Sequence, residues 1–311
     1  MGSDTKIKHQ QHRTQTLIGN FMNKTLLLTA VSALLVACGT VKTSQSSNQN
    51  VTLKFAAEIN GQIFECGKSY ANVGTTRSTI TPSDFRMYVS EIKLVRKDGE
   101  KVAVELQQDG IWQHQNVALL DFENGTGSCR NGTIPINTTI RGSVPTGEYT
   151  GLEFTVGVPF ELNHQDPTIA PSPMNSTAMF WNWQGGYKFI KFDTASTGIS
   201  PQKPAAANVV GPVTGYSVHL GSTACAAPSR TQAPKSCQNP NRIAVRFDRF
   251  NHQTNVIVAD MGSVLALANV DVNAPGSAAG CMSAPDDADC PPIMKALGLA
   301  PQSSQKFLNQ R

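Results

Sequence analysis

Short apolar segments rich in β-branched and aromatic residues recur along this 311-residue chain, and clusters of Gly, Pro, Asn and Ser separate them. Such segments are typical of β-strands, whereas few stretches show the period of an amphipathic helix. The sequence therefore predicts an all-β fold, a single β-sandwich or barrel-like domain with long loops. The expected strands are Val51–Ile59, Phe85–Val95, Lys101–Leu106, Tyr149–Val158, Tyr187–Phe192, Tyr216–Leu220, Ile243–Phe247 and Asn255–Ala259, with a short helix over Ile293–Leu297.

The connections between these strands are of two kinds. Asp98-Gly99 is a turn signal, so the segments before and after it are expected to form a hairpin. Three other connections are long and irregular: Glu161–Asn182, Thr194–Thr214 and Ala274–Pro292. Loops of that length in a compact domain are usually functional or disordered.

The chain from Met22 onward resembles a bacterial export leader. Lys24 supplies a positive charge, and the apolar run from Leu26 to Ala37 is too short to span a bilayer. The run ends in LVACG, which resembles a lipobox whose cysteine, here Cys38, is lipidated after cleavage. The alternative interpretation is a buried helix with an ordinary cysteine.

This leader divides the chain into three expected parts: a leader (1–37), a polar lipid-anchored tether (38–50) and a β domain (51–311). The expected location is the bacterial cell envelope, at the periplasmic face or as an outer-membrane lipoprotein, with the lipid anchor as the only membrane contact. The leader holds four basic residues and one acid of a chain whose formal charge is +4, so the mature chain is nearly neutral. That balance removes the electrostatic argument for a nucleic-acid partner.

Six cysteines remain after Cys38, and an even number in an exported chain predicts disulfides. Six cysteines allow about fifteen connectivities. Cys225–Cys237 and Cys281–Cys290 are favoured because they close short loops, which leaves Cys66–Cys129. Thiolate metal ligation is the alternative, but the sequence contains no Cys-x-x-Cys pair.

A set of potential metal ligands lies in the long segment after Pro159. It holds His164, Met174 and Met179, together with the tryptophans Trp181 and Trp183. Imidazole and thioether groups suit copper, Cu(I) especially. A second histidine, His219, lies within a predicted strand and therefore points in a fixed direction.

Each of these residues also has a structural interpretation. A histidine at a strand end is more often structural than a ligand, and two tryptophans at i and i+2 are most simply a core or surface pair. The methionines could fill gaps in a core. No Gly-x-Ser-x-Gly, His-Glu-x-x-His or P-loop motif is present, so no catalytic residue is assigned.

Several motifs, taken in order, resemble the MbnP-like family of periplasmic copper-binding proteins, also called metallo-mystery pair four-Cys motif proteins. They are FRMYVSEIKLV, WQHQNVALLDFENGTGSC, GVPFELNHQDP, PSPMN with MFWNWQGGYKF, HLGSTAC and CMSAPDDADCPP. The resemblance covers most of residues 51–300. It implies a β-rich, exported, non-catalytic protein.

The resemblance also implies a partner, a MauG-like di-haem cytochrome c peroxidase homologue that oxidises a tryptophan of the family member to kynurenine. Carried onto this sequence, His164 and His219 are the candidate ligands of Cu(I). Trp181 or Trp183 is the candidate kynurenine and third ligand, with Trp183 favoured, and Trp181–Gly186 is expected near the surface. The four-Cys pattern matches Cys225, Cys237, Cys281 and Cys290, with Cys66 and Cys129 as a further pair.

The function expected from the resemblance is copper acquisition, storage or delivery by a lipoprotein. The competing hypothesis is a structural or adhesive β-sandwich lipoprotein whose WNW loop binds a partner or glycan. An envelope oxidase is the third, disfavoured because the mature chain has only four histidines and no nucleophile constellation.

Overall fold

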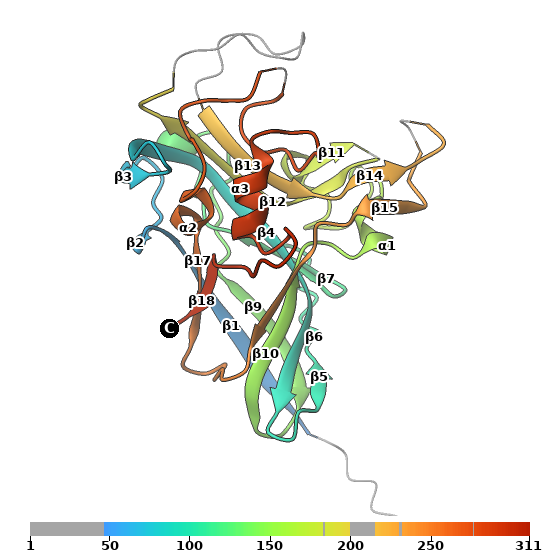
Figure 1. Cartoon of the computed structure of the whole chain (residues 1–311). Helices are drawn as coiled ribbons and strands as arrows, with labels where there is room; N and C mark the ends of the chain where they lie inside the picture. Colours follow the sequence, from blue (N-terminus) through green and yellow to red (C-terminus); the bar gives the residue numbers. More distant parts are fainter. Residues whose placement is uncertain (1–46, 183, 200–214, 230–231, 276) are drawn as a thin grey trace, which may run out of the picture. The chain divides into compact units, whose positions relative to one another are not determined.

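The computed structural model describes residues 47–182, 184–199, 215–229, 232–275 and 277–311 (Figure 1). The predicted leader, Cys38 and most of the tether lie outside these residues. The strands are β1 (Asn48–Ile59), β2 (Gln62–Ile63), β3 (Tyr70–Val73), β4 (Ser78–Arg96), β5 (Lys101–Ala103), β6 (Glu105–Leu106), β7 (Gln113–His114), β8 (Val117–Asp121), β9 (Thr139–Pro145), β10 (Tyr149–Val156), β11 (Phe180–Asn182), β12 (Gly186–Ser196), β13 (Gly215–Gly221), β14 (Thr223–Ala226), β15 (Ser236–Asn239), β16 (Ile243–Phe247), β17 (Val256–Asp260) and β18 (Leu308–Gln310). The helices are α1 (Phe160–Asn163), α2 (Met261–Leu265) and α3 (Cys290–Ala296), with 3-10 turns η1 (Gly127–Cys129) and η2 (Thr177–Met179).

The smaller of the two main sheets is built around β1. Its strand order is β18-β17-β1-β9-β6, and β1 runs parallel to β17 and antiparallel to β9. Val51, Leu53 and Phe55 alternate inward along β1 and are all buried, as the period of a half-buried strand requires. β1 begins at Asn48, so the last residues assigned to the tether belong to the sheet.

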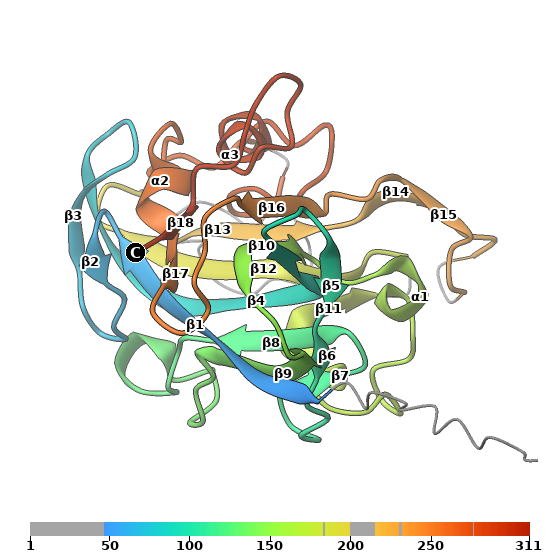
Figure 2. The same ribbon diagram turned by 90° about the horizontal axis from the view of Figure 1, so that it is seen from below.

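The larger sheet is organised by the long strand β4. The first half of β4 pairs with β12, and its second half pairs with β10. Glu91 lies within the second half with φ 55°, at the point where the pairing with β10 shifts register. A β-bulge of this kind bends a strand and increases its twist. Figure 2 shows β13, β12, β4 and β8 lying side by side.

The hydrophobic core lies between these two sheets. The ring of Phe55 on β1 meets that of Phe154 on β10 edge-on, 6.0 Å between centroids. Phe85 of β4 makes similar contacts with Phe64 and Phe192. Each large apolar side chain buried here stabilises the fold by about 1.5–3 kcal/mol. The predicted all-β sandwich is confirmed.

The predicted strand segments and the short helix are confirmed, with one correction. Lys101–Leu106 is not a single strand: β5 pairs with β4 in the large sheet, completing the predicted hairpin, whereas β6 pairs with β9 in the small sheet. The chain changes sheets at Val104, between them. Several strands were not predicted; most are short, but β9 and the fully buried β8 are among them.

The part of the chain that the structure describes contains three disulfides: Cys66–Cys129, Cys225–Cys237 and Cys281–Cys290. These are the pairings favoured from the sequence. The second links β14 to β15, and the third ties the start of α3 to residue 281, which bridges to β13. Disulfides stabilise a fold mainly by restricting its unfolded chain. Within the described ranges, no helix is both long and apolar enough to cross a membrane.

Candidate functional site

Asn163, the last residue of α1, joins three segments that are distant in sequence. Its Oδ1 accepts a hydrogen bond from the backbone N–H of Tyr187 at 2.9 Å, and its Nδ2 lies 3.4 Å from Ser222 Oγ. A Cβ atom added at Gly186 would lie only 2.6 Å from Asn163 Cγ. α1 therefore rests directly on the start of β12 and beside the end of β13. We call this arrangement the Asn163 clamp.

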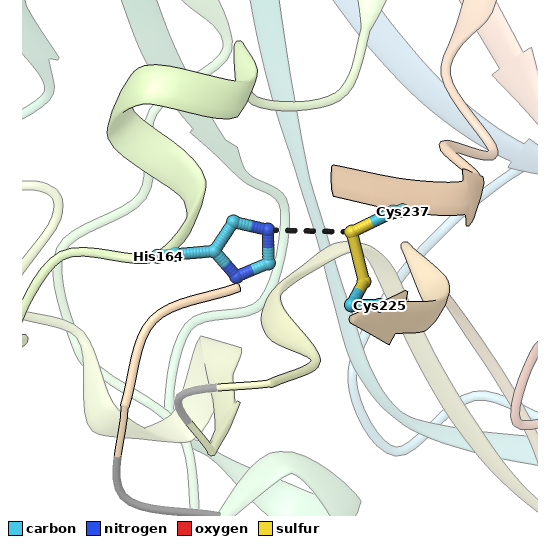
Figure 3. Close-up of side chains that lie close together, drawn as sticks. All are labelled: His164, Cys225 and Cys237. Carbon is cyan, nitrogen blue, oxygen red and sulfur yellow. Dashed lines mark hydrogen bonds between the residues drawn. A yellow bond between two sulfur atoms is a disulfide. The ribbon is translucent and has the colours of Figure 1, made fainter. Parts of the chain in front are cut away.

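The clamp fixes the next residue, His164, whose side chain is buried. The His164 Nε2 atom lies 3.5 Å from Cys237 Sγ, so the imidazole faces the Cys225–Cys237 disulfide (Figure 3). Its ring also packs against Phe160, 4.9 Å between centroids. The two sulfur atoms are bonded to each other and are not thiolates, so His164 is the member of this cluster that could offer a donor atom to a metal.

Trp181 lies on the short strand β11, which pairs with β12. A Cβ atom at Gly221 would lie 2.5 Å from Trp181 Cζ3, so the indole ring rests on the backbone of β13. Trp181 is partly exposed, as expected for this segment, although Gly186 is buried. Trp183 lies outside the described residues.

His219 occupies the middle of β13 with its side chain largely buried. Its Nε2 atom lies 2.7 Å from Asp193 Oδ1 on β12. Burial disfavours the ionised form of Asp193, but the hydrogen bond and charge of His219, with Lys191, outweigh that effect and hold the pKa of Asp193 well below its usual range. An ionised carboxylate accepts, so Nε2 carries a proton, and Nδ1 is the nitrogen that a neutral ring offers to a metal.

The structure places Trp181 and His219 on one face of β13, because His219 and Gly221 are two residues apart on the strand. The preceding residue, Asn163, contacts Ser222 directly after the end of β13, and this contact places His164 near that end of the strand. The two histidines have different neighbours, however. Among the described residues, neither group of three close metal-binding side chains contains His219.

Sequence reasoning missed a row of charged residues across this face of the large sheet. Asp121 on β8 pairs in register with Arg86 on β4, Arg86 with Lys191 on β12, and Lys191 with His219. Asp84 and Asp193 belong to the same network: Arg86 Nε donates to Asp84 at 2.9 Å, and Lys191 Nζ contacts Asp84 and lies 2.8 Å from Asp193. We call these six side chains the charged row.

The long segment after α1 covers this face of the sheet. The hydroxyl of Tyr88 donates to the carbonyl of Pro173 at 2.9 Å, and that of Tyr187 donates to the carbonyl of Met174. Lys188 Nζ donates to the carbonyl of Ala178 at 2.8 Å. Burial, followed by repulsion from Lys191, lowers the pKa of Lys188 to about 8.

Both methionines of this segment, Met174 and Met179, are buried and belong to the hydrophobic core, in agreement with the gap-filling interpretation. Asn163 and Gly221 carry no chemistry of their own and were not predicted. The only sequence signals for them are an amide directly before His164 and a glycine two residues after His219.

The fold and this site define a disulfide-stabilised β-sandwich in which one loop and one strand bring histidine and tryptophan side chains to a single sheet face. The MbnP family model matches residues 48–283, and the chain therefore belongs to the MbnP family. The structure is similar to that of MbnP from Methylosinus trichosporium, with a TM-score of 0.71 and 30% identity, covering 85% of this chain and 98% of the other. Comparison with curated proteins gives no match.

Proposed function

We propose that this protein is a copper-binding lipoprotein of the bacterial envelope that binds Cu(I) through His164, His219 and a kynurenine formed from Trp181 or Trp183. The observation that carries the proposal is the Asn163 clamp, which holds the loop of His164 against the start of β12 and beside the end of β13. β13 carries His219, and the indole of Trp181 rests on it at Gly221. Membership of the MbnP family, which is associated with copper, supports it.

The donor set is suited to copper. Cu(I) is a soft ion that imidazole nitrogens bind well at low coordination number. Asp193 keeps a proton on His219 Nε2 and so presents Nδ1, as carboxylates commonly do behind metal-binding histidines. The disulfide-bonded surroundings of His164 restrict its ring. Binding rather than turnover is the proposed role, in acquisition, storage or delivery of copper.

The proposed kynurenine requires an exported oxidant, and the proposed partner is a MauG-like di-haem cytochrome c peroxidase homologue. Its haems would use two molecules of peroxide, reduced to water, to insert two oxygen atoms at the indole C2–C3 bond. Hydrolysis of the resulting formamide then releases formate and leaves an aryl amine beside a ketone. The partial exposure of Trp181 supports access by such a partner.

The copper site is tested by Cu(I) titration in competition with a chromophoric chelator. We expect His164→Ala and His219→Ala each to weaken Cu(I) binding by about 100-fold or more, because each removes a ligand whose loss exceeds the effect of a supporting residue. His252→Ala is the control and should bind like the unmodified sequence. Unchanged stoichiometry and affinity in both histidine variants would contradict the assignment.

The modification is tested separately by intact-mass and peptide mass analysis after co-expression with the di-haem partner. The mass should shift from tryptophan to kynurenine at one position of the Trp181–Trp183 pair, and the corresponding Trp→Phe variant should lose the shift. Trp112→Phe serves as control and should retain it. A protein whose tryptophans all stay unmodified in active co-expression would refute this part while leaving the histidine ligands to the copper titration.

A further inference from the structure

A cavity of about 310 Å³ opens beside the end of the charged row that lies farthest from His219. Arg86, Leu119 and Asp121 line it from strands β4 and β8. Its remaining walls come from three loops, at residues 111–112, 133–135 and 172–176. The volume is that of a small ligand pocket. No residue of the candidate copper site lines it.

The loop walls of this cavity are held by specific hydrogen bonds. The Asp109 carboxylate accepts from the backbone N–H groups of Ile111 and Trp112, at 2.9 and 2.7 Å. The hydroxyl of Ser172 donates to the carbonyl of Ile111 at 2.8 Å, which joins the wall at 111–112 to the wall at 172–176. The pocket is therefore formed before any ligand arrives.

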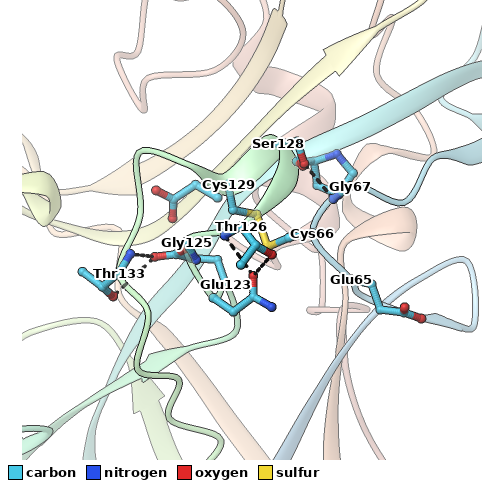
Figure 4. Close-up of a disulfide and its surroundings, with 12 residues drawn as sticks. Glu65, Cys66, Gly67, Glu123, Gly125, Thr126, Ser128, Cys129 and Thr133 are labelled. Atoms are coloured by element: carbon cyan, nitrogen blue, oxygen red, sulfur yellow. Dashed lines mark hydrogen bonds between the residues drawn. A yellow bond between two sulfur atoms is a disulfide. The ribbon is translucent and has the colours of Figure 1, made fainter.

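The electrostatics of the cavity floor leave one carboxyl without full compensation. Arg86 is buried next to Asp84, Asp121 and Glu123, and both its Nε and one terminal nitrogen are already committed to Asp84. The carboxylate of Glu123 is stabilised by hydrogen bonds that it accepts from the backbone N–H groups of Gly125 and Thr133, at 2.8 and 2.5 Å (Figure 4).

Asp121 receives less support. It accepts one hydrogen bond from Thr133 Oγ1 at 3.0 Å and one from the backbone N–H of Glu123 at 3.2 Å. Burial is the largest effect and raises the pKa of Asp121 to about 7. The charge of Arg86 and the two hydrogen bonds lower this pKa, and the charge of Glu123 raises it, but together they do not cancel the effect of burial. The floor of the cavity thus has the capacity for one additional positive charge.

We propose that this cavity binds a small organic ammonium ion with an apolar body, its charge paired with the Asp121 carboxylate and its body packed against Trp112, Leu119 and Pro173. The indole of Trp112 offers a cation–π contact in addition to apolar surface. A carboxylate ligand is disfavoured, because it would add a further negative charge beside three acids and a guanidinium that already has a partner.

The proposal gives a definite pH dependence. Near pH 7 the Asp121 carboxyl of the free protein is partly protonated, and an ammonium ion binds its ionised form. Arg86 and Glu123 are the charged groups that act on Asp121, with Asp84 bound to the far side of the interaction through Arg86, and they shift this balance without reversing it. Affinity should therefore rise with pH, approaching about tenfold per unit below the pKa, and level off above it.

The experiment is isothermal titration calorimetry of the copper-free protein with phenethylammonium, its neutral analogue 2-phenylethanol and the anion phenylacetate. We expect phenethylammonium to bind best and more tightly at pH 8 than at pH 6. Asp121→Asn should weaken it at least tenfold and remove the pH dependence. Asp248→Asn, a change at an exposed carboxylate, should leave both unchanged.

A second variant keeps the test decisive if Asp121→Asn folds poorly. Trp112→Leu should weaken phenethylammonium severalfold while the pH dependence persists, since the carboxyl is intact. The proposal is overturned if phenylacetate binds best, if 2-phenylethanol binds equally well, or if none of the three binds. Because no copper ligand is involved, none of these results bears on the proposed copper site.

Discussion

Replacement of Arg86 by methionine should lower the free energy of unfolding by about 3–5 kcal/mol, the cost of leaving buried partner charges uncompensated. Arg86 is buried and holds Asp84 through two hydrogen bonds, with Asp121 on its other side. Methionine retains much of the side-chain volume but none of the charge. The loss should therefore reflect the electrostatics of the charged row and not a cavity.

The measurement is urea unfolding of the disulfide-intact protein at several pH values. Without Arg86, the neighbouring carboxyls are expected to take up protons in the folded state with raised pKa values. Protonation removes the uncompensated charge, so the destabilisation should be larger at pH 8 than at pH 5. Arg246→Met, at a side chain 60% exposed, is the control and should cost far less, because exposed ion pairs contribute little to stability. If the two changes lower the free energy of unfolding equally, Arg86 does not stabilise the protein by compensating the buried carboxylates of the charged row.

Replacement of Gly186 by alanine should cost about 2–5 kcal/mol, which combines a left-handed backbone penalty with an overpacking penalty. Gly186 has φ 70°, and its added Cβ would lie 2.6 Å from Asn163 Cγ. The clamp would have to open, and His164 would move with α1. Chemical unfolding should show the loss of stability, and Cu(I) titration should show weakened binding.

Gly99→Ala is the matched control for this change. Gly99 lies in the turn between β4 and β5 with φ 91°, and nothing lies within 4 Å of an added Cβ. It should show the backbone penalty alone, about 1–2 kcal/mol, and unchanged Cu(I) binding. If Gly186→Ala behaves like Gly99→Ala in both assays, the Asn163 clamp does not hold the site.

The sequence was informative where a strand has one face in the core and one outside it. Val51–Ile59 and Tyr216–Leu220 alternate, and both were predicted as strands. β8 was missed because all five of its residues are buried, so it has no alternation to detect. The division of Lys101–Leu106 between two sheets is a tertiary event, because only the positions of β4 and β9 decide it.

The candidate site was predictable in its chemistry but not in its assembly. Histidine and tryptophan motifs predicted His164, His219 and either Trp181 or Trp183, with Trp183 favoured, through a family resemblance, and their role as ligands stays a prediction. Asn163 and Asp193 position these residues through a loop contact and through strand register. Neither kind of contact can be predicted from a single sequence. The same holds for the charged row, whose members come from four strands.

The charged row also limits how this surface can change over evolutionary time. Loss of Lys191 alone would remove one of the two cations beside Asp84 and would leave Asp193 with His219 only, whereas loss of Arg86 alone would leave Asp84 with Lys191 only and Asp121 without its guanidinium neighbour. A complete exchange for well-packed apolar side chains carries no such penalty. A sequence that has lost only one of these cations is therefore expected to be less stable than one with the complete row or one with a complete apolar replacement. We therefore expect related sequences that carry the row to keep its members together, and to vary more in the loops around it.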